Sequence, residues 1–397
     1  MCRPPNSARV AAVVGTRPEA IKLAPVLLAA REESILDTCL ISTGQHREVH
    51  DQVLELFGLT PDIRVDVMDH GQSLARLSAR CLVQLEQALL ESEPDVVLVQ
   101  GDTTSAAMAG LAAFYARIPV WHVEAGLRTS TADMPFPEEM NRRLLARISS
   151  FHLAPTERAR QNLLREGLAD EAIAVTGNTG IDALFAALRA RQEFKDPFLS
   201  AATVEAGPIL VVTAHRRENW GTGIRSVAAA CRDLLEAFPD LRVIHAAHPN
   251  PSVRADVEAE LQGHPRAVLV DPVDYGDFVR LLARAAVIVT DSGGIQEEAP
   301  SFGVPVLVTR AETERLESLD AGLSRVVGPD REAIVASVSR ILRDPVDPDP
   351  SRMENPYGDG NAARRIVDLL IGRLFAARSA APERAGALAE GRSLHIP

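Results

Sequence analysis

The chain has 397 residues, 46% of them hydrophobic and 24% charged, which is enough for two or three domains with sizeable cores and excludes global disorder. Its 54 acidic residues outnumber its 42 basic residues, and the formal net charge of −12 argues against a general nucleic-acid-binding protein, which needs a basic face. Aromatic residues make up only 4% of the chain, so stacking platforms for single-stranded nucleic acid are not expected either.

Short β-branched runs alternate with amphipathic stretches along the first half of the chain. The predicted strands are Val10–Val14, Ile35–Ser42, Val96–Val99, Val120–Val123, Phe151–Ala154 and Ala172–Thr176. The predicted helices between them include Glu19–Arg31, Leu74–Glu91 and Ala106–Ala116. Strands that are apolar on both faces and are separated by helices predict a parallel sheet covered on both sides.

A second unit of the same kind follows after Gln192–Pro208, which contains Pro197 and has little periodicity, as expected of a hinge. Its predicted strands are Ile209–Thr213, Arg242–Ala246, Ala267–Val270, Val287–Thr290 and Val306–Val308. Two doubly wound units that face each other place a ligand site at the C-terminal ends of their strands. We expect domains over residues 1–190 and 191–360, a final helix over 361–376, and a disordered tail over 377–397.

The cysteines and the N-terminus bear on the compartment. The four cysteines are far apart, with no spacing typical of a metal site or a disulfide framework: Cys2, Cys39, Cys81 and Cys231. They are typical of buried thiols in a reducing compartment. The first residues lack the long apolar stretch of a secretory signal, and no apolar run reaches about 18 residues. We therefore expect a cytoplasmic protein without a membrane partner.

The turn after the first strand, Gly15-Thr16-Arg17-Pro18-Glu19, opens a helix. The N–H groups at such a start favour an anion, and Arg17 and Lys22 add positive charge. An ordinary turn with a surface arginine is the alternative. The turn matches neither GxGxxG nor a P-loop, which argues against NAD and nucleoside triphosphates.

The turn after the second strand contains two histidines, His46 and His50, with the i, i+4 spacing of a zinc-binding helix. Arg47 stands where the HExxH motif has its glutamate, and no third ligand is evident. We therefore expect no metal site.

Three carboxylates follow predicted strands in the first half: Asp102, Glu124 and Glu138. Asp102 could cap the next helix, and an acidic residue at a helix start, such as Glu138, is favoured by the helix dipole. Each of them alone therefore has a structural interpretation. Together at one edge of a sheet, the three fit general acid–base chemistry.

Two turns in the second half favour phosphate. The run His215-Arg216-Arg217-Glu218 follows a strand and is too polar for a core. Asp291-Ser292-Gly293-Gly294 ends another strand and opens a helix, which exposes N–H groups as a pyrophosphate cradle. Glu298 could accept hydrogen bonds from ribose hydroxyls, and Arg315 could add positive charge. A tight turn is the alternative for Ser-Gly-Gly alone, but the combination favours a phosphate site.

Together these motifs resemble the non-hydrolysing UDP-N-acetylglucosamine 2-epimerase family. The matching stretches run from residue 15 to about 360 and read GTRPEAIKLAPV, TGQHREV, QGDTTSA, HVEAGLRT, PFPEEMNRRL, TGNTGIDAL, TAHRREN, TDSGGIQEEAPSFGVPVLV and NPYGDG. The resemblance implies an α/β protein of GT-B architecture, with two Rossmann-like doubly wound parallel-sheet domains around a central cleft. It also implies a C-terminal helix that crosses back onto the first domain, and a homodimer.

The implied reaction is the reversible C2 epimerisation of UDP-N-acetylglucosamine to UDP-N-acetylmannosamine, by anti elimination of UDP to 2-acetamidoglucal and re-addition. It needs no cofactor and no metal. The resemblance assigns catalysis to Asp102, Glu124, Glu138 and His215. It assigns substrate binding to Arg17, Lys22, Arg142, His215, Phe278, Ser292, Gly293, Gly294, Glu298 and Arg315. It further implies UDP-N-acetylglucosamine as an allosteric effector at Gln45, His46 and His248.

The sequence departs from the family pattern in three loops. Asp133 and Met134 stand where the family usually has an aromatic residue and a serine, ERLE replaces ERPE at Leu316, and AGL replaces AGT at Leu323. Because these loops belong to the sugar and nucleotide regions, a 2-epimerase of a modified UDP-sugar, such as a diacetamido uronic acid, is one alternative. A GT-B glycosyltransferase, a hydrolysing epimerase and an inactive nucleotide-sugar sensor are the others.

Overall fold

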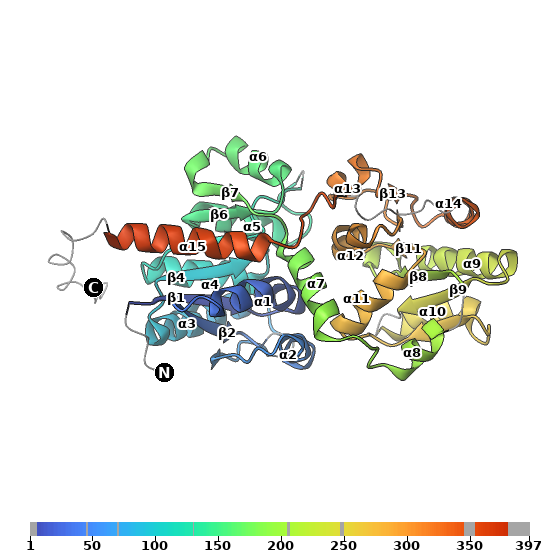
Figure 1. Cartoon of the computed structure of the whole chain (residues 1–397), viewed down its shortest axis with the longest axis horizontal. Helices are drawn as coiled ribbons and strands as arrows, with labels where there is room; N and C mark the ends of the chain where they lie inside the picture. The colour runs from blue at the N-terminus through green and yellow to red at the C-terminus, as the bar shows by residue number, and fades with distance from the viewer. Residues whose placement is uncertain are drawn as a thin grey trace.

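The structure is a computed structural model that describes residues 6–44, 47–69, 71–129, 131–204, 207–246, 250–344 and 354–379. Two α/β domains lie side by side along the long axis of the molecule (Figure 1). Each is built on one parallel sheet, as the sequence predicts.

The first sheet has the strand order β3-β2-β1-β4-β5-β6-β7. Its strands are β1 (Ala8–Val14), β2 (Leu36–Ser42), β3 (Ile63–Arg64), β4 (Val96–Gln100), β5 (Val120–Val123), β6 (Phe151–Ala154) and β7 (Ile173–Val175). The helices of this part are α1 (Arg17–Arg31), α2 (Arg47–Leu56), α3 (Leu74–Ser92), α4 (Thr104–Tyr115), α5 (Glu138–Ile148), α6 (Glu157–Arg165) and α7 (Thr179–Ala190), with a 3-10 turn at Asp170–Ala172.

Alternation along β1 shows that both faces of this sheet are covered. Val10 and Ala12 belong to the core that contains the apolar side chains of α1, whereas Ala11 and Val13 belong to the core that contains those of α3 and α4. The strands β1 and β4 are adjacent, and the direction of the strand order reverses between them. The chain leaves these two strands toward opposite faces of the sheet, which opens a crevice at their C-terminal ends. The turns that carry Arg17 and Asp102 are therefore neighbours.

The second sheet has the order β10-β9-β8-β11-β12-β13. Its strands are β8 (Ile209–Thr213), β9 (Arg242–Ala246), β10 (Ala267–Val270), β11 (Val287–Thr290), β12 (Val306–Val308) and β13 (Ser324–Val326). Its helices are α8 (Pro197–Val204), α9 (Thr222–Ala237), α10 (Pro251–Leu261), α11 (Tyr275–Arg284), α12 (Gly293–Glu298), α13 (Leu316–Asp320) and α14 (Arg331–Arg343), with 3-10 turns at Arg217–Asn219 and Ala299–Phe302. Neither here nor elsewhere in the described ranges is a helix long and apolar enough to cross a membrane.

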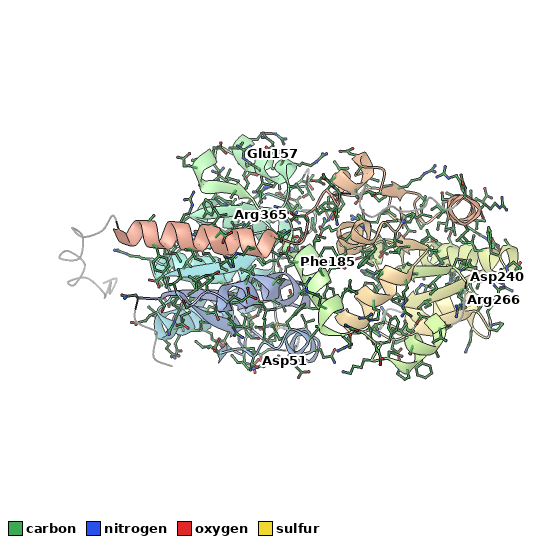
Figure 2. All side chains as sticks on the ribbon, in the orientation of Figure 1. Asp51, Glu157, Phe185, Asp240, Arg266 and Arg365 are labelled. Carbon is green, nitrogen blue, oxygen red and sulfur yellow. The ribbon has the colours of Figure 1, made fainter. Side chains whose placement is uncertain are left out.

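The last helix, α15 (Ala362–Ser379), returns to the first domain and lies along α1 and α7 (Figure 1). Asp182 of α7 accepts hydrogen bonds from the N–H groups of Ala362 (3.2 Å) and Ala363 (2.9 Å) and so satisfies the start of the helix. Arg365, labelled in Figure 2, donates to the carbonyl of Thr176 beside β7 at 3.1 Å. The second domain is therefore joined to the first by chain crossings at both of its ends.

The expected hinge over Gln192–Pro208 is wrong in its central part. Residues Pro197–Val204 form α8, and Leu199 is fully buried in the core of the second domain. Asp196 explains the helix, because its carboxylate accepts the N–H of Phe198 at 2.7 Å, and Pro197 suits a first helical position. The domain limits at residues 190 and 360 stay predictions, and residues 380–397 of the expected tail lie outside the described residues.

Candidate active site

The turn from β1 into α1 brings Arg17 and Lys22 to the boundary between the domains. The sequence predicts an external anion at this helix start, but Glu19 takes that place: its carboxylate accepts the N–H groups of Gly15 (2.7 Å) and Thr16 (2.6 Å). The turn is tight, since a Cβ on Gly15 would lie 2.4 Å from the Thr43 hydroxyl oxygen. The positive charge that this turn offers a ligand therefore comes from its side chains.

Lys22 connects the two domains. Its ammonium group contacts the carboxylate of Glu124, at the end of β5, and lies 3.4 Å from a carboxylate oxygen of Glu297, on α12 of the second domain. The Arg315 guanidinium in turn contacts Glu297 at 2.8 Å. We call Lys22, Glu124, Glu297 and Arg315 the interdomain quartet.

Two amides anchor the carboxylates of the quartet. Gln100, the last residue of β4, donates to Glu124. Asn178 caps α7 through its side-chain oxygen Oδ1, which accepts the N–H of Gly180 at 2.9 Å, and its side-chain nitrogen Nδ2 donates to Glu297 at 2.8 Å. Each carboxylate is thus held by one side-chain amide and by at least one cation.

The two glutamates of the quartet have different proton affinities. Burial raises the pKa of Glu124, and the charge of Glu297 adds to that effect against the opposing effect of Lys22. Burial also acts on Glu297, but Lys22 and Arg315 outweigh it and lower the pKa of Glu297. Burial opposes the charge on Lys22, and the two glutamates overcome it and raise the pKa of Lys22 above its usual value. Glu124 is therefore the member that accepts a proton most readily.

The backbone aims Glu124 by an unusual conformation. Its φ angle of 65° lies in the left-handed region, which a residue with a Cβ rarely occupies and which is found at functional sites. Gly101, on the neighbouring turn, has a φ of 71°. The carbonyl of Gly101 accepts a hydrogen bond from Nε2 of His122 at 2.7 Å, and burial lowers the pKa of His122 to about 3, so the ring is neutral with its proton on Nε2.

Asp102 follows Gly101 and does not cap α4. The cap is Thr103, whose hydroxyl accepts the N–H of Ala106 at 3.0 Å. The Asp102 carboxylate instead lies 3.0 Å from the Arg142 guanidinium of α5, and Asn141 of the same helix donates to the Asp102 carbonyl at 2.8 Å. Asp102 is thus free of a structural capping role, and α5 holds it in place.

The adjacent glutamates at the start of α5 occupy different surroundings. Glu139 is fully buried and accepts the Nε–H of Arg143 at 2.9 Å, and it lies 3.3 Å from Arg142. Glu138 is half-buried. The Asp102 carboxylate contacts Arg142 of α5. Glu138 lies on the same helix as Arg142, but within the described residues it takes no part in that ion pair.

Asp291 organises the turn that carries His215. One of its carboxylate oxygens accepts the N–H groups of His215 and Arg216, both at 2.9 Å, and the side-chain amide of Asn219 at 3.0 Å. The other oxygen lies 3.3 Å from Nδ1 of His215. Asp291 is fully buried, whereas the His215 side chain is 43% exposed. A buried carboxylate therefore orients an imidazole toward the space that a ligand can reach.

The predicted phosphate cradle follows β11 directly. Ser292 occupies the N-cap position of α12, and Gly293 and Gly294 are its first two residues. A Cβ on Gly293 would lie 3.1 Å from the guanidinium carbon of Arg315, whereas no atom of the described residues lies within 4 Å of a Cβ on Gly294. Arg315 thus packs directly on the cradle, which remains open at Gly294.

Glu298 ends α12 and faces the first domain. It accepts a hydrogen bond from the Tyr275 hydroxyl at 3.1 Å, and burial together with the charge of Glu297 raises the pKa of Glu298 to about 7. Arg17 reaches the same region and donates to the carbonyl of Val273 at 3.3 Å. Phe278 of α11 is half-buried and packs against the apolar core of the second domain.

The sequence-predicted residues are therefore brought together in part. Lys22, Glu124 and Arg315 meet in the quartet, and Asp102 meets Arg142. The predicted effector residues Gln45, His46 and His248 lie outside the described residues. Five further residues organise the site, and the sequence motifs did not predict a role for them: Gln100, Asn178, Tyr275, Asp291 and Glu297. Four of them lie inside the quoted motifs, but the pattern does not say which neighbouring glutamate spans the domains.

Comparisons with known proteins give a consistent result. The sequence profile of the family described as UDP-N-acetylglucosamine 2-epimerase matches residues 28–371. A UDP-N-acetylglucosamine 2-epimerase from Escherichia coli K12 is 45% identical over 372 residues, which cover 91% of this chain and 98% of that protein. The crystal structure of the Neisseria meningitidis UDP-GlcNAc 2-epimerase bound to UDP-GlcNAc matches with a TM-score of 0.84 and 41% identity, over 92% of this chain and 100% of that one.

The fold extends beyond close relatives. A glycotransferase of kitacinnamycin matches with a TM-score of 0.64 over 93% of this chain and 100% of that one. Its identity is 15%, so it shows the GT-B fold alone.

Proposed function

The chain belongs to the UDP-N-acetylglucosamine 2-epimerase family, and from that membership we propose that it interconverts UDP-N-acetylglucosamine and UDP-N-acetylmannosamine. The observation that carries the proposal is the interdomain quartet, which sets a carboxylate able to take a proton beside two cations able to hold a diphosphate. A 2-epimerase needs both functions within one sugar's length of each other.

The chemistry explains why both are needed. The hydrogen on C2 of the sugar is poorly acidic, because no carbonyl is attached to that carbon. As the C1–O bond breaks, its electron pair goes to the diphosphate oxygen, and positive charge develops at C1 and acidifies C2–H. A carboxylate takes the C2 proton, the C–H electron pair forms the C1=C2 bond, and 2-acetamidoglucal and UDP result.

The return step completes the inversion. A proton is delivered to the opposite face of C2, and a diphosphate oxygen attacks C1, which gives UDP-N-acetylmannosamine. The sequence needs a carboxylate on each face of the ring, and we assign the proton transfers to the set of three carboxylates Asp102, Glu124 and Glu138. We assign charge stabilisation of the departing diphosphate to Lys22 and Arg315.

His215 is proposed to bind or protonate the departing phosphate oxygen. The contact with Asp291 supports this role, because it orients the imidazole of His215 and leaves the exposed side of the ring to a ligand. Ser292, Gly293 and Gly294 are proposed to hold the diphosphate. The N–H of Ser292 donates to the Thr290 hydroxyl at 3.0 Å, so Ser292 would contribute its hydroxyl and the glycines their N–H groups. Glu298 is proposed to bind the ribose.

The test is to incubate the protein with UDP-N-acetylglucosamine and follow the mixture by proton NMR. The proposal expects UDP-N-acetylmannosamine with the nucleotide attached. Free N-acetylmannosamine and UDP would show the hydrolysing reaction instead. Inertness toward this substrate with turnover of a UDP-diacetamido uronic acid would show a modified sugar, and transfer to an added acceptor would show a glycosyltransferase.

We further propose a homodimer, which the resemblance implies. An apolar exposed surface on α3 and α4 supports it: Val83, Leu90, Phe114 and Tyr115 are each at least 55% exposed. Sedimentation of the protein and of Phe114→Asp tests it, because the charge should shift the population to monomer.

The effector site and the cytoplasmic location are likewise proposals. The location is supported by Cys39, Cys81 and Cys231, which are buried free thiols.

A further inference from the structure

Glu297 is the one member of the quartet to which the proposed reaction assigns no role. It is a second-domain residue, 3% exposed, and each of its carboxylate oxygens is in use. One oxygen accepts the Arg315 Nε–H at 2.8 Å. The other accepts the Asn178 amide at 2.8 Å and the Lys22 ammonium at 3.4 Å. Asn178 and Lys22 belong to the first domain, so Glu297 contacts both domains through one carboxylate.

The neighbouring Glu298 cannot serve the same purpose. Its hydrogen bond goes to Tyr275 within the second domain, and its pKa of about 7 leaves it partly protonated near neutrality. Glu297 stays ionised, because Lys22 and Arg315 lower its pKa. The chain therefore holds a permanent negative charge at the point where the domains meet.

We propose that Glu297 is a positioning residue that holds Lys22 and Arg315 in place for the diphosphate and directs the reaction's proton to Glu124. The inference rests on the proposed function. It adds a residue that acts through Lys22, Arg315 and Glu124 and does not itself touch the sugar.

Charge balance gives the physical basis. The two cations and two carboxylates of the quartet sum to zero when all four are ionised. A diphosphate brought against Lys22 and Arg315 adds negative charge in a site from which water is largely excluded, which favours uptake of a proton by one carboxylate. Because Glu297 has three donors and Glu124 has two, the proton goes to Glu124. This proton comes from solvent, and Glu124 delivers it to C2 in the return step, while another carboxylate of the proposed set takes the proton that leaves C2.

The direction of the effect on Glu124 follows from the groups that face it. These are Lys22 from α1, Gln100 from β4, Glu297 from α12 and Arg315 from the segment before α13. Of these only Glu297 is negative. Its removal therefore leaves the cations unopposed, and Glu124 holds its proton less tightly.

The experiment compares the wild type with Glu297→Gln, which keeps the shape and the bond from Asn178. Loosening Arg315 and Lys22 should raise KM for UDP-N-acetylglucosamine by about tenfold or more, the range for a lost charge-assisted hydrogen bond. The limb of the kcat–pH profile that reports Glu124 should move to lower pH by about one unit. This direction holds whether that limb requires the carboxylate or the carboxylic acid.

Glu314→Gln is the matched control. Glu314 contacts the far side of the same guanidinium at 2.6 Å but contacts neither Lys22 nor Glu124 within the described residues. It should raise KM and leave the pH limb in place. An equal movement of the limb in both variants would overturn the assignment, and so would an unchanged KM and limb in Glu297→Gln.

A conservative variant covers a failure to fold. If circular dichroism shows that Glu297→Gln is unfolded, Glu297→Asp keeps the charge on a shorter side chain. It should raise KM and keep the wild-type limb, and a limb moved by about one unit would contradict the proposal. Absence of C2 epimerisation by the wild type itself would instead count against the proposed function, whereas an active wild type isolates the role of Glu297.

Discussion

Glu124 and Glu297 contact the ammonium group of Lys22, yet their surroundings raise the pKa of Glu124 and lower the pKa of Glu297. Glu124 has Lys22 and one amide as partners, whereas Glu297 has Lys22, Arg315 and an amide. Pairs of titratable groups whose pKa values are pushed apart mark acid–base assignments at active sites. Within this pair, Glu297 keeps its negative charge and Glu124 gains and loses a proton.

Removing a proton-transfer group should lower turnover without unfolding the chain. Asp102→Asn, Glu124→Gln and Glu138→Gln should each reduce kcat by about 10²–10⁴-fold, the range for a lost general acid or base. Thermal unfolding should stay close to wild type for Glu138→Gln, because Glu138 is half-buried at a helix start. Full activity in any one variant would remove that residue from the proposed set.

The adjacent Glu139 provides a contrasting substitution. It is fully buried and holds Arg142 and Arg143, so Glu139→Gln should lower the free energy of unfolding by about 1–3 kcal/mol. Denaturant unfolding of the two neighbouring variants measures the difference. Equal stabilities for Glu138→Gln and Glu139→Gln would show that the two glutamates are not separated as the structure has them.

Glu298 should make stability depend on pH. Its pKa is raised from 4.5 to about 7, so the folded chain binds the proton more tightly than the unfolded chain. The resulting contribution to stability is complete below the unfolded pKa and is lost as the pH rises through about 7. Because the side chain keeps some contact with solvent, we expect the loss to be about 2 kcal/mol.

Glu298→Gln tests this dependence, since the amide does not titrate. Thermal unfolding of both proteins at about pH 5 and about pH 8 should show the variant gaining stability relative to wild type at the higher pH. A difference between the two that stays constant with pH would contradict the assignment. Other titrating groups are common to both proteins and cancel.

At the scale of elements, the site lies where parallel strands end and helices begin. The β1–α1, β4–α4 and β5 turns place Lys22, Asp102 and Glu124, and the β8 and β11 turns place His215 and Ser292. Close packing of these turns fixes the side chains. Gly15 shows how little space there is, because a Cβ would lie 2.4 Å from Thr43 and 2.8 Å from Ser105.

Gly15→Ala should therefore destabilise the fold by about 1–3 kcal/mol, the range for overpacking, and lower activity by displacing α1. Gly372→Ala, within α15, is the control, because a Cβ there has no neighbour within 4 Å in the part of the chain that the structure describes. It should leave activity unchanged and stabilise the helix by about 0.5–1 kcal/mol. Unfolding midpoints of both variants measure the contrast, and the same midpoint for both would refute it.

The long apolar strands could be predicted from sequence almost residue by residue, as Val120–Val123 and Ile209–Thr213 show. The edge strands β3 and β13 could not, because they have two and three residues and little apolar pattern. Helix α8 was missed because Pro197 was interpreted as a sign of irregular chain rather than as a helix start. Shortness alone does not decide the outcome, because the three-residue edge strand β7 (Ile173–Val175) was predicted as Ala172–Thr176.

The site was predicted to the level of motifs. The sequence motifs placed Asp102, Glu124 and Arg315 near strand ends, but Glu297 and Glu298 are adjacent and chemically identical. Which of them reaches Lys22 depends on how the second domain sits against α1, and that long-range packing has no local signal. The same holds for Asp291, whose partners lie on a different strand turn.

In the molecule as a whole, apolar packing and ion pairs both join the domains, because Tyr275 and Val279 of α11 are buried in the core of the first domain. Arg158 of α6 contacts Asp320 of α13 at 2.8 Å, and Thr156 donates to Glu317 at 2.9 Å. Closure of the domains would keep water and the glucal intermediate apart.

UDP should stabilise the whole molecule because it is proposed to bridge the domains. At about one hundred times its Kd, a ligand that binds only the folded state adds about 2.7 kcal/mol to the free energy of unfolding. Thermal unfolding with increasing UDP should show a rising midpoint in the wild type and a smaller rise in Arg315→Ala. A midpoint insensitive to UDP would exclude this nucleotide as a ligand.

The central claim is that C2 loses its proton and regains one while UDP leaves and returns. Incubation with UDP-N-acetylglucosamine in D2O, followed by NMR, tests this directly. We expect deuterium at C2 of the UDP-N-acetylmannosamine formed, and less exchange in Glu124→Gln. Epimerised product that retains its original C2 hydrogen, or intact protein that exchanges none, would contradict it.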